Sequence, residues 1–78
     1  MKLKYQARYI KGERKELPAV LDVRAMNIIA AGKAWSKQLG KQGYHALYSA
    51  QADGLPWGQY LLVCNRGTAA VYSIEGNQ

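Results

Sequence analysis

A chain of 78 residues with one cysteine, one histidine and a formal net charge of +6 fits a single small domain, and this composition excludes several classes of protein. A single cysteine cannot form a disulfide bond within the chain, and Cys64 and His45 have no companion ligands at metal-binding spacing. No apolar run approaches a membrane span, and Met1 precedes alternating lysines rather than a signal sequence. We therefore expect one soluble, cytoplasmic domain over residues 1–78, without metal, cofactor or membrane contact.

The first two predicted strands form a hairpin. Residues 2–10 alternate between apolar or tyrosine side chains on one face and mostly basic side chains on the other, which predicts a half-buried strand. Residues 17–25 alternate in the same way, and residues 11–15 between them are a polar, glycine-containing turn. Because Pro18 has no N–H to donate, we expect the second strand to lie at a sheet edge.

After Asn27 the apolar period changes to that of a helix. Asn27 is a suitable N-cap and Gly40 a suitable stop, so the pattern predicts an amphipathic helix over residues 28–39. Gly32 lies on or beside the buried stripe, where glycine costs about 1 kcal/mol relative to alanine. We expect it to permit close approach to a bulky sheet residue such as a tyrosine. The residues predicted to face the sheet are Ile28, Ala31, Trp35 and Leu39.

The second half of the chain predicts three further strands. Residues 44–51 alternate, and residues 69–74 follow a tight glycine-containing turn. Residues 59–65 are almost entirely apolar, which indicates a central strand buried on both faces. The Gly and Pro content of residues 52–58 predicts a loop, and residues 75–78 form a polar tail that we expect to fray.

The order strand, strand, helix, strand, strand, strand predicts a two-layer α+β fold. A mostly antiparallel five-stranded sheet would carry one amphipathic helix packed on one face. One helix covers only part of such a sheet, so the other face is either wet or buried by a second copy. The near-continuous apolar run at residues 60–64 favours the second alternative, and we expect a homodimer.

The sequence contains no catalytic motif, and we predict that the protein is not an enzyme. His45 has no acid–base partner fixed by the sequence, the carboxylates occur singly, and Cys64 in an apolar strand is typical of a small core residue. Small basic nucleases do use a lone histidine with Tyr, Lys or Arg. A His45-dependent nuclease is therefore a third functional hypothesis, after the two that follow.

The basic residues are concentrated in one half of the chain. Residues 1–41 carry a net charge of +7 and residues 42–78 a net charge of −1, an asymmetry that favours an anionic partner, most often nucleic acid. The alternative is a solvated face that keeps a small protein soluble. No known nucleic-acid-binding signature is present. The predicted nucleic-acid-binding residues are Lys2, Lys4, Arg8, Lys11, Arg14, Lys15, Lys33, Lys37 and Lys41.

The second hypothesis is a protein-interaction module, an inhibitor or adaptor of the kind found among phage and mobile-element proteins of this size and layout. Trp57 lies in a glycine-flanked loop, where a large aromatic side chain is a common binding hot spot. The alternative for Trp57 is that it folds back to plug the end of the core. The predicted protein-interaction residues are Trp57, Tyr44 and Tyr48.

Overall fold

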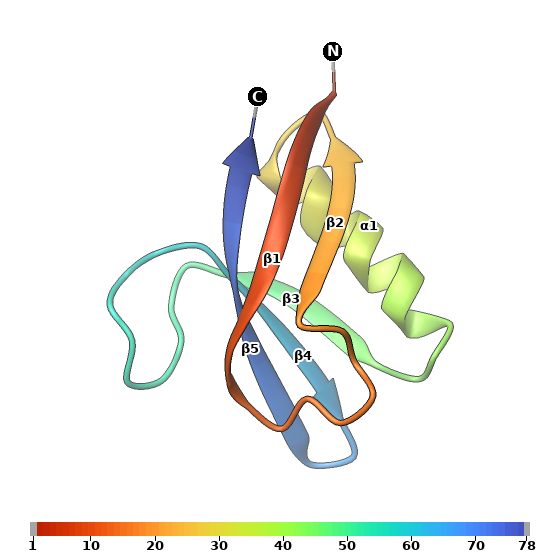
Figure 1. Ribbon diagram of the computed structural model, residues 1–78, viewed down its shortest axis with the longest axis vertical. Coiled ribbons are helices and arrows are strands. Elements are labelled where there is room, and N and C mark those ends of the chain that lie inside the picture. The colour runs from red at the N-terminus through yellow and green to blue at the C-terminus, as the bar shows by residue number, and fades with distance from the viewer. Residues whose placement is uncertain (1, 78) are drawn as a thin grey trace.

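A computed structural model describes residues 2–77 and contains one antiparallel sheet and one helix (Figure 1). The sheet has five strands in the order β2-β1-β5-β4-β3, and every neighbouring pair is antiparallel. This confirms the predicted α+β class with a mostly antiparallel sheet. The elements are β1 (Leu3–Gly12), β2 (Val20–Ala25), α1 (Ile28–Gly40), β3 (His45–Ser49), β4 (Tyr60–Asn65) and β5 (Thr68–Asn77).

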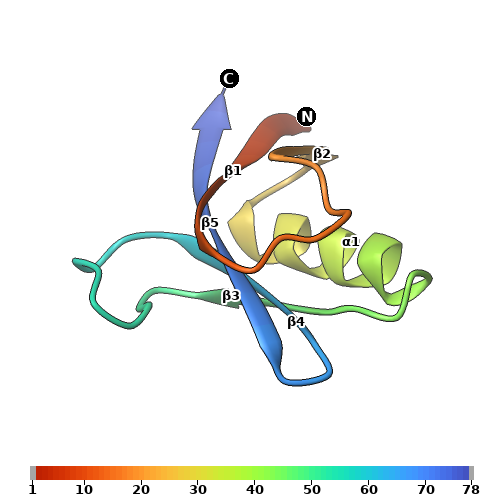
Figure 2. The ribbon, with the colours of Figure 1, turned by 60° about the horizontal axis from the view of Figure 1, so that its bottom comes forward.

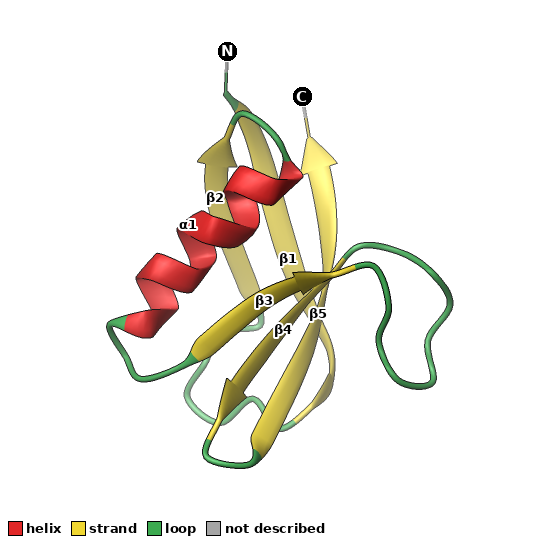
Figure 3. Cartoon of the chain, turned by 180° about the vertical axis from the view of Figure 1, so that it is seen from behind, coloured by secondary structure: helices red, strands yellow, loops and turns green. Residues whose placement is uncertain are grey.

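The helix connects the two edges of the sheet. β2 and β3 are the edge strands, and α1, which joins them in sequence, packs chiefly against these two. The sheet is curled so that α1 lies between β2 and β3 (Figure 2), and from behind the helix crosses in front of the sheet (Figure 3). A helix beside a strand edge shields its unpaired N–H and C=O groups from other chains. One element therefore protects both edges.

The strand alternation divides the sheet into an inner face toward α1 and an outer face away from it. On β1, Tyr5 and Ala7 are buried on the inner face, while Lys4 and Arg8 are exposed on the outer one. Trp35 of α1 has no exposed surface and packs in the same cluster, which confirms the predicted helix phase. The largest fully buried side chains of this core are Trp35, Tyr72, Leu61 and Val63.

The helix begins where the sequence predicts and ends slightly later. The Oδ1 atom of Asn27 accepts a hydrogen bond from the Ala30 N–H at 2.9 Å, which confirms the N-cap. The predicted stop at Gly40 is one residue early, because Gly40 is still helical and Lys41 is the C-cap. The left-handed residue comes at Gly43, whose φ is 87°.

The second strand is shorter than predicted. It begins at Val20 rather than at residue 17, because residues 14–17 form a turn in which the Leu17 N–H donates to the Arg14 carbonyl at 3.0 Å. Leu17 is nevertheless buried in the core. A buried position in a turn requires an apolar side chain just as a buried position in a strand does. Leu17 therefore fits the alternation of the strand without belonging to it. β2 does lie at a sheet edge, as Pro18 predicts.

The predicted frayed tail is wrong for residues 75–77, which extend β5. They pair with β1 through Gln6–Glu75, Tyr5–Gly76 and Lys4–Asn77. Ladder hydrogen bonds use backbone groups, so polar side chains on the solvent side do not prevent pairing. Residue 78 lies outside the described residues. The third strand is also shorter than residues 44–51 and covers His45–Ser49.

The β4–β5 hairpin has a two-residue turn, Arg66 and Gly67, with φ angles of 50° and 82°. Positive φ at both central residues is the hairpin geometry that matches the strand twist. β4 is an interior strand, as predicted, but its outer face is only partly buried. Leu61 and Val63 are buried on the inner face, whereas on the outer face Tyr60 is buried, Leu62 is half-buried and Cys64 is exposed.

Candidate interaction surfaces

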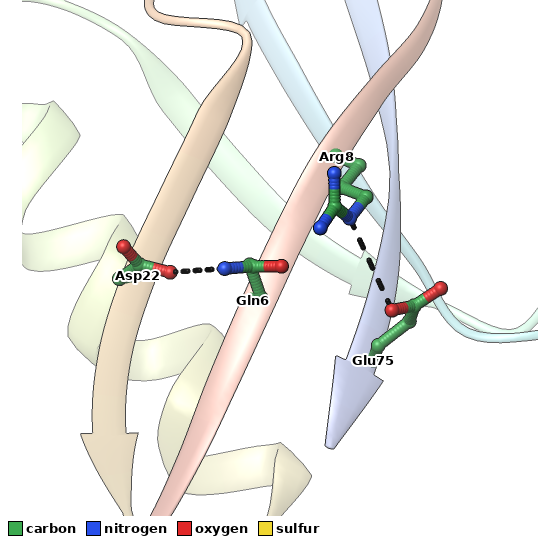
Figure 4. A network of polar contacts seen from close by, with 4 residues as sticks. All are labelled: Gln6, Arg8, Asp22 and Glu75. Atoms are coloured by element: carbon green, nitrogen blue, oxygen red, sulfur yellow. Dashed lines mark hydrogen bonds and ion pairs between the residues drawn. The ribbon is translucent and has the colours of Figure 1, made fainter. Parts of the chain in front are cut away.

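The outer face of β1, β2 and the end of β5 is polar, and acidic side chains lie among its basic ones. Gln6 Nε2 donates to Asp22 Oδ1 at 3.1 Å, and Arg8 Nε lies 4.0 Å from Glu75 Oε2 (Figure 4). Both members of the ion pair are more than half exposed, so its contribution to stability is small. The basic residues of this half, which include the predicted site residues Lys4 and Arg8, therefore lie among acids.

Two of the three basic residues at the end of β1 and in the β1–β2 connection, Lys11 and Arg14, make contacts within the fold. Lys11 Nζ donates to the Asp53 carbonyl of a distant loop. The guanidinium of Arg14 lies 5.3 Å from the centroid of the Tyr9 ring and donates to the Leu17 carbonyl at 2.7 Å. Lys15 is exposed, and Glu13 and Glu16 flank it in the same connection. This group therefore presents no strong positive field.

The third basic group is the lysine row, which consists of Lys33, Lys37 and Lys41. All three are exposed on or just after α1, four residues apart, and residues 23–52 contain no Asp or Glu. Because α1 covers the inner face, this row lies on the opposite side of the sheet from Lys4 and Arg8. The predicted basic residues therefore do not form one patch. Lys2, also predicted, is exposed just before β1.

The outer face of β3, β4 and β5 carries an apolar row between polar residues such as His45 and Ser49. Leu47, Leu62 and Val71 are register partners across the three strands and form a row on the outer face. Leu47 is 64% exposed, while Leu62 and Val71 are half-buried. We call Leu47, Leu62 and Val71, together with Leu55 and Trp57, the apolar outer surface.

The 50–59 loop stands over one side of this surface. The Gly58 N–H donates to the Ala50 carbonyl at 3.0 Å and closes the loop at its base. The Tyr60 hydroxyl donates to the Pro56 carbonyl at 2.5 Å, and Lys11 holds the loop from β1. Between the loop and the outer face is a pocket of about 640 Å³, lined by loop residues and by Leu62 and Val71 among others.

Trp57 is the most exposed large hydrophobic residue in the described chain. Its side chain is 74% exposed and lines the 640 Å³ pocket. The alternative that Trp57 plugs the core is therefore wrong. Tyr44 and Tyr48, the other predicted interaction residues, lie half-buried on the inner face and do not share a surface with Trp57.

His45 and Cys64 are register partners on the outer face, and both are exposed. The sequence pattern alone does not pair them, because only the register of β3 against β4 sets these two positions opposite each other. Within residues 2–77, no group of three or more His, Cys, Asp or Glu side chains could hold a metal ion. No helix in the same span is long and apolar enough to cross a membrane.

No protein-family model, curated protein or solved structure matches this chain. Its function must be inferred from the surfaces described above.

Proposed function

We propose that this protein is a small, non-catalytic nucleic-acid-binding accessory protein that contacts the phosphate backbone through the lysine row. The observation that supports this proposal is the absence of any acid from residues 23–52, while the other basic groups lie beside acids. An uncompensated row of lysines attracts polyanions, and contacts to phosphates carry no sequence information. We place this activity in the cytoplasm, because an exposed free thiol such as Cys64 suits a reducing compartment.

The spacing of the row suits a repeating charge. Lysines four residues apart on a helix are separated by about 6 Å along its axis. One strand of duplex DNA carries a phosphate about every 3.4 Å along its axis, so three lysines can face roughly every second phosphate. Ser36, which is exposed and lines a groove with Lys33, adds a hydroxyl of the kind that donates to phosphate oxygens.

Fluorescence anisotropy with labelled single- and double-stranded oligonucleotides at several salt concentrations tests the proposal. Three phosphate contacts predict a slope of log K against log salt of about −2.7 on duplex DNA. The double variant Lys33→Glu/Lys37→Glu should lose binding. The matched control is Lys2→Glu/Lys4→Glu, which makes the same change in net charge away from α1 and should retain most of the affinity.

Two results would contradict the proposal. Equal loss in both double variants would mean that net charge, rather than the lysine row, determines binding. If neither oligonucleotide binds below about 100 micromolar in low salt, the affinity is weaker than that of ordinary non-specific binding. Such a result would exclude nucleic acid as the partner.

The exposure of Trp57 favours a second candidate function, a protein-interaction module that acts as an inhibitor or adaptor. The two functions predict opposite rankings of the same variants. For a protein partner, Trp57→Ala abolishes the complex while Lys33→Glu/Lys37→Glu mainly slows association. For nucleic acid, Trp57→Ala has little effect unless single strands are preferred and the indole stacks on a base.

A further inference from the structure

We propose that the nucleic acid bound by this protein is single-stranded, and that the groove between α1 and β3 receives an unpaired base beside the lysine row. This inference rests on the proposed function and names the class of nucleic acid that the same surface would bind. Its support is the apolar surface directly beside the lysines, which contacts to phosphates alone do not require.

The groove combines apolar side chains with groups that bind phosphate. The sheet curls around α1 (Figure 2), and the helix and the edge strand β3 together form a groove of about 320 Å³. Ile29 of α1 and Leu47 of β3 are 52% and 64% exposed and line it from opposite sides, and Lys33 and Ser36 belong to its helix side. Lys37 follows Lys33 by four residues and so lies on the same side of α1. A ligand in this groove therefore meets apolar surface and positive charge together.

The size and shape of the groove favour an unpaired base. A volume of about 320 Å³ lies at the lower end of the range for small-ligand sites, about 300–1,000 Å³, and suits one small flat group. The bases of a single strand can be splayed out, so that their faces cover Ile29 and Leu47, whereas the bases of a duplex stay stacked on one another. Apolar side chains that enter a duplex do so as projecting wedges, but these two line a hollow.

The spacing of the lysines also suits an unstacked strand. Lysines four residues apart on a helix are separated by about 6 Å along its axis, whereas a duplex strand carries a phosphate about every 3.4 Å. A single strand becomes more extended where a base leaves the stack, and its consecutive phosphates then lie farther apart. Each of these phosphates can meet a lysine, while a duplex can use only about every second one.

Fluorescence anisotropy tests the inference with three probes that carry the same label. The probes are a single strand, its duplex, and the same strand made abasic at every position. Charge alone predicts the tightest binding for the duplex, because the duplex has the highest charge density. We expect the reverse order, with the intact single strand bound at least about 5-fold more tightly than either of the other two probes.

A change in the groove that leaves the charge unaltered separates base contact from phosphate contact. Leu47→Ser should lower the affinity for the single strand about 5-fold through lost apolar contact, while the duplex affinity and the slope against salt stay the same. The matched control is Val20→Ser, a similar change at a residue that is 38% exposed on β2, the other edge strand. It should leave the affinities for all three probes unchanged.

An abasic strand that binds as tightly as the intact strand would overturn the inference. An effect of Leu47→Ser no larger than that of Val20→Ser would also overturn it. In both cases, loss of binding in Lys33→Glu/Lys37→Glu would leave the proposed function standing, because phosphate contacts through the lysine row would remain. If none of the three probes binds below about 100 micromolar in low salt, both proposals fail and the groove is left to another partner, such as an acidic peptide.

Discussion

The backbone of α1 at Gly32 lies directly against Tyr48 of β3. A Cβ atom placed on Gly32 would be 3.0 Å from the Cβ of Tyr48, closer than side chains ordinarily pack. This is the close approach to a tyrosine that the sequence predicts for Gly32. It brings the helix onto the edge strand, and so it contributes to shielding the free edge of the sheet.

Gly32→Ala should destabilise the protein although alanine favours a helix. The added methyl group meets the base of the Tyr48 side chain, which a strand holds in place, and overpacking of this kind costs about 1–3 kcal/mol. Gly40→Ala is the matched control, because nothing lies within 4 Å of its Cβ position. It should stabilise by up to about 1 kcal/mol. Urea unfolding of both variants measures the difference, and equal stabilisation by both would contradict the contact.

The two tryptophans should respond oppositely to truncation. Trp35 is fully buried, and Trp35→Ala should cost about 3–5 kcal/mol, enough to unfold a domain of this size. Trp57 is 74% exposed, and Trp57→Ala should change the monomer's stability by no more than about 0.5 kcal/mol. Thermal unfolding followed by circular dichroism measures both, at a concentration too low for association. A Trp35→Ala protein that melts like the wild type would show that the helix phase is wrong.

Tyr72 should make the protein sensitive to alkaline pH. Burial is the main cause that raises the pKa of its hydroxyl above the ordinary 10.0, with Tyr9 and Tyr44 adding to the shift and Arg14 opposing it. Above pH 10.0 the unfolded chain loses a proton that the folded chain retains. The free energy of unfolding therefore falls as pH rises through the raised pKa, by at most about 1.4 kcal/mol per pH unit.

Tyr72→Phe isolates this effect. The Tyr72 hydroxyl donates to the Pro18 carbonyl at 2.7 Å, and its loss should cost about 1 kcal/mol near neutral pH. The variant lacks the titrating group, so its deficit relative to the wild type should shrink above pH 10.0. Urea titrations at neutral and alkaline pH measure the difference. A deficit that stays constant across this range would contradict a raised pKa in the folded state.

The helix N-terminus offers a fourth prediction. Asn27→Ala removes the acceptor for the Ala30 N–H and should destabilise by about 1 kcal/mol. Asn27→Asp keeps the acceptor and adds a negative charge at a helix whose first turn has no acid, so its stability should equal or exceed that of the wild type. Chemical unfolding of the two variants tests the cap. Equal losses in both would show that the side-chain oxygen is not the relevant group.

Several features were determined by the sequence itself because they depend on local periodicity. The alternation of residues 2–10 places the side chains of Tyr5 and Lys4 on opposite faces of any sheet that contains this strand. The helical spacing places Trp35 on the buried side, and Asn27 can cap only the helix that begins beside it. Such features involve neighbours within a few positions along the chain, so they do not depend on which other segments pack nearby.

Only the tertiary structure decided how these segments combine. It placed α1 on the face opposite Lys4 and Arg8, so the basic residues that cluster in the sequence form separate groups in space. Strand order gave residues 75–77 a partner in β1, and strand register set His45 beside Cys64. The same arrangement turned Tyr48 inward and left Trp57 exposed beside the apolar outer surface. Which distant segments pair is decided by how the apolar side chains of all segments are buried together. The periodicity within one segment does not specify its partner.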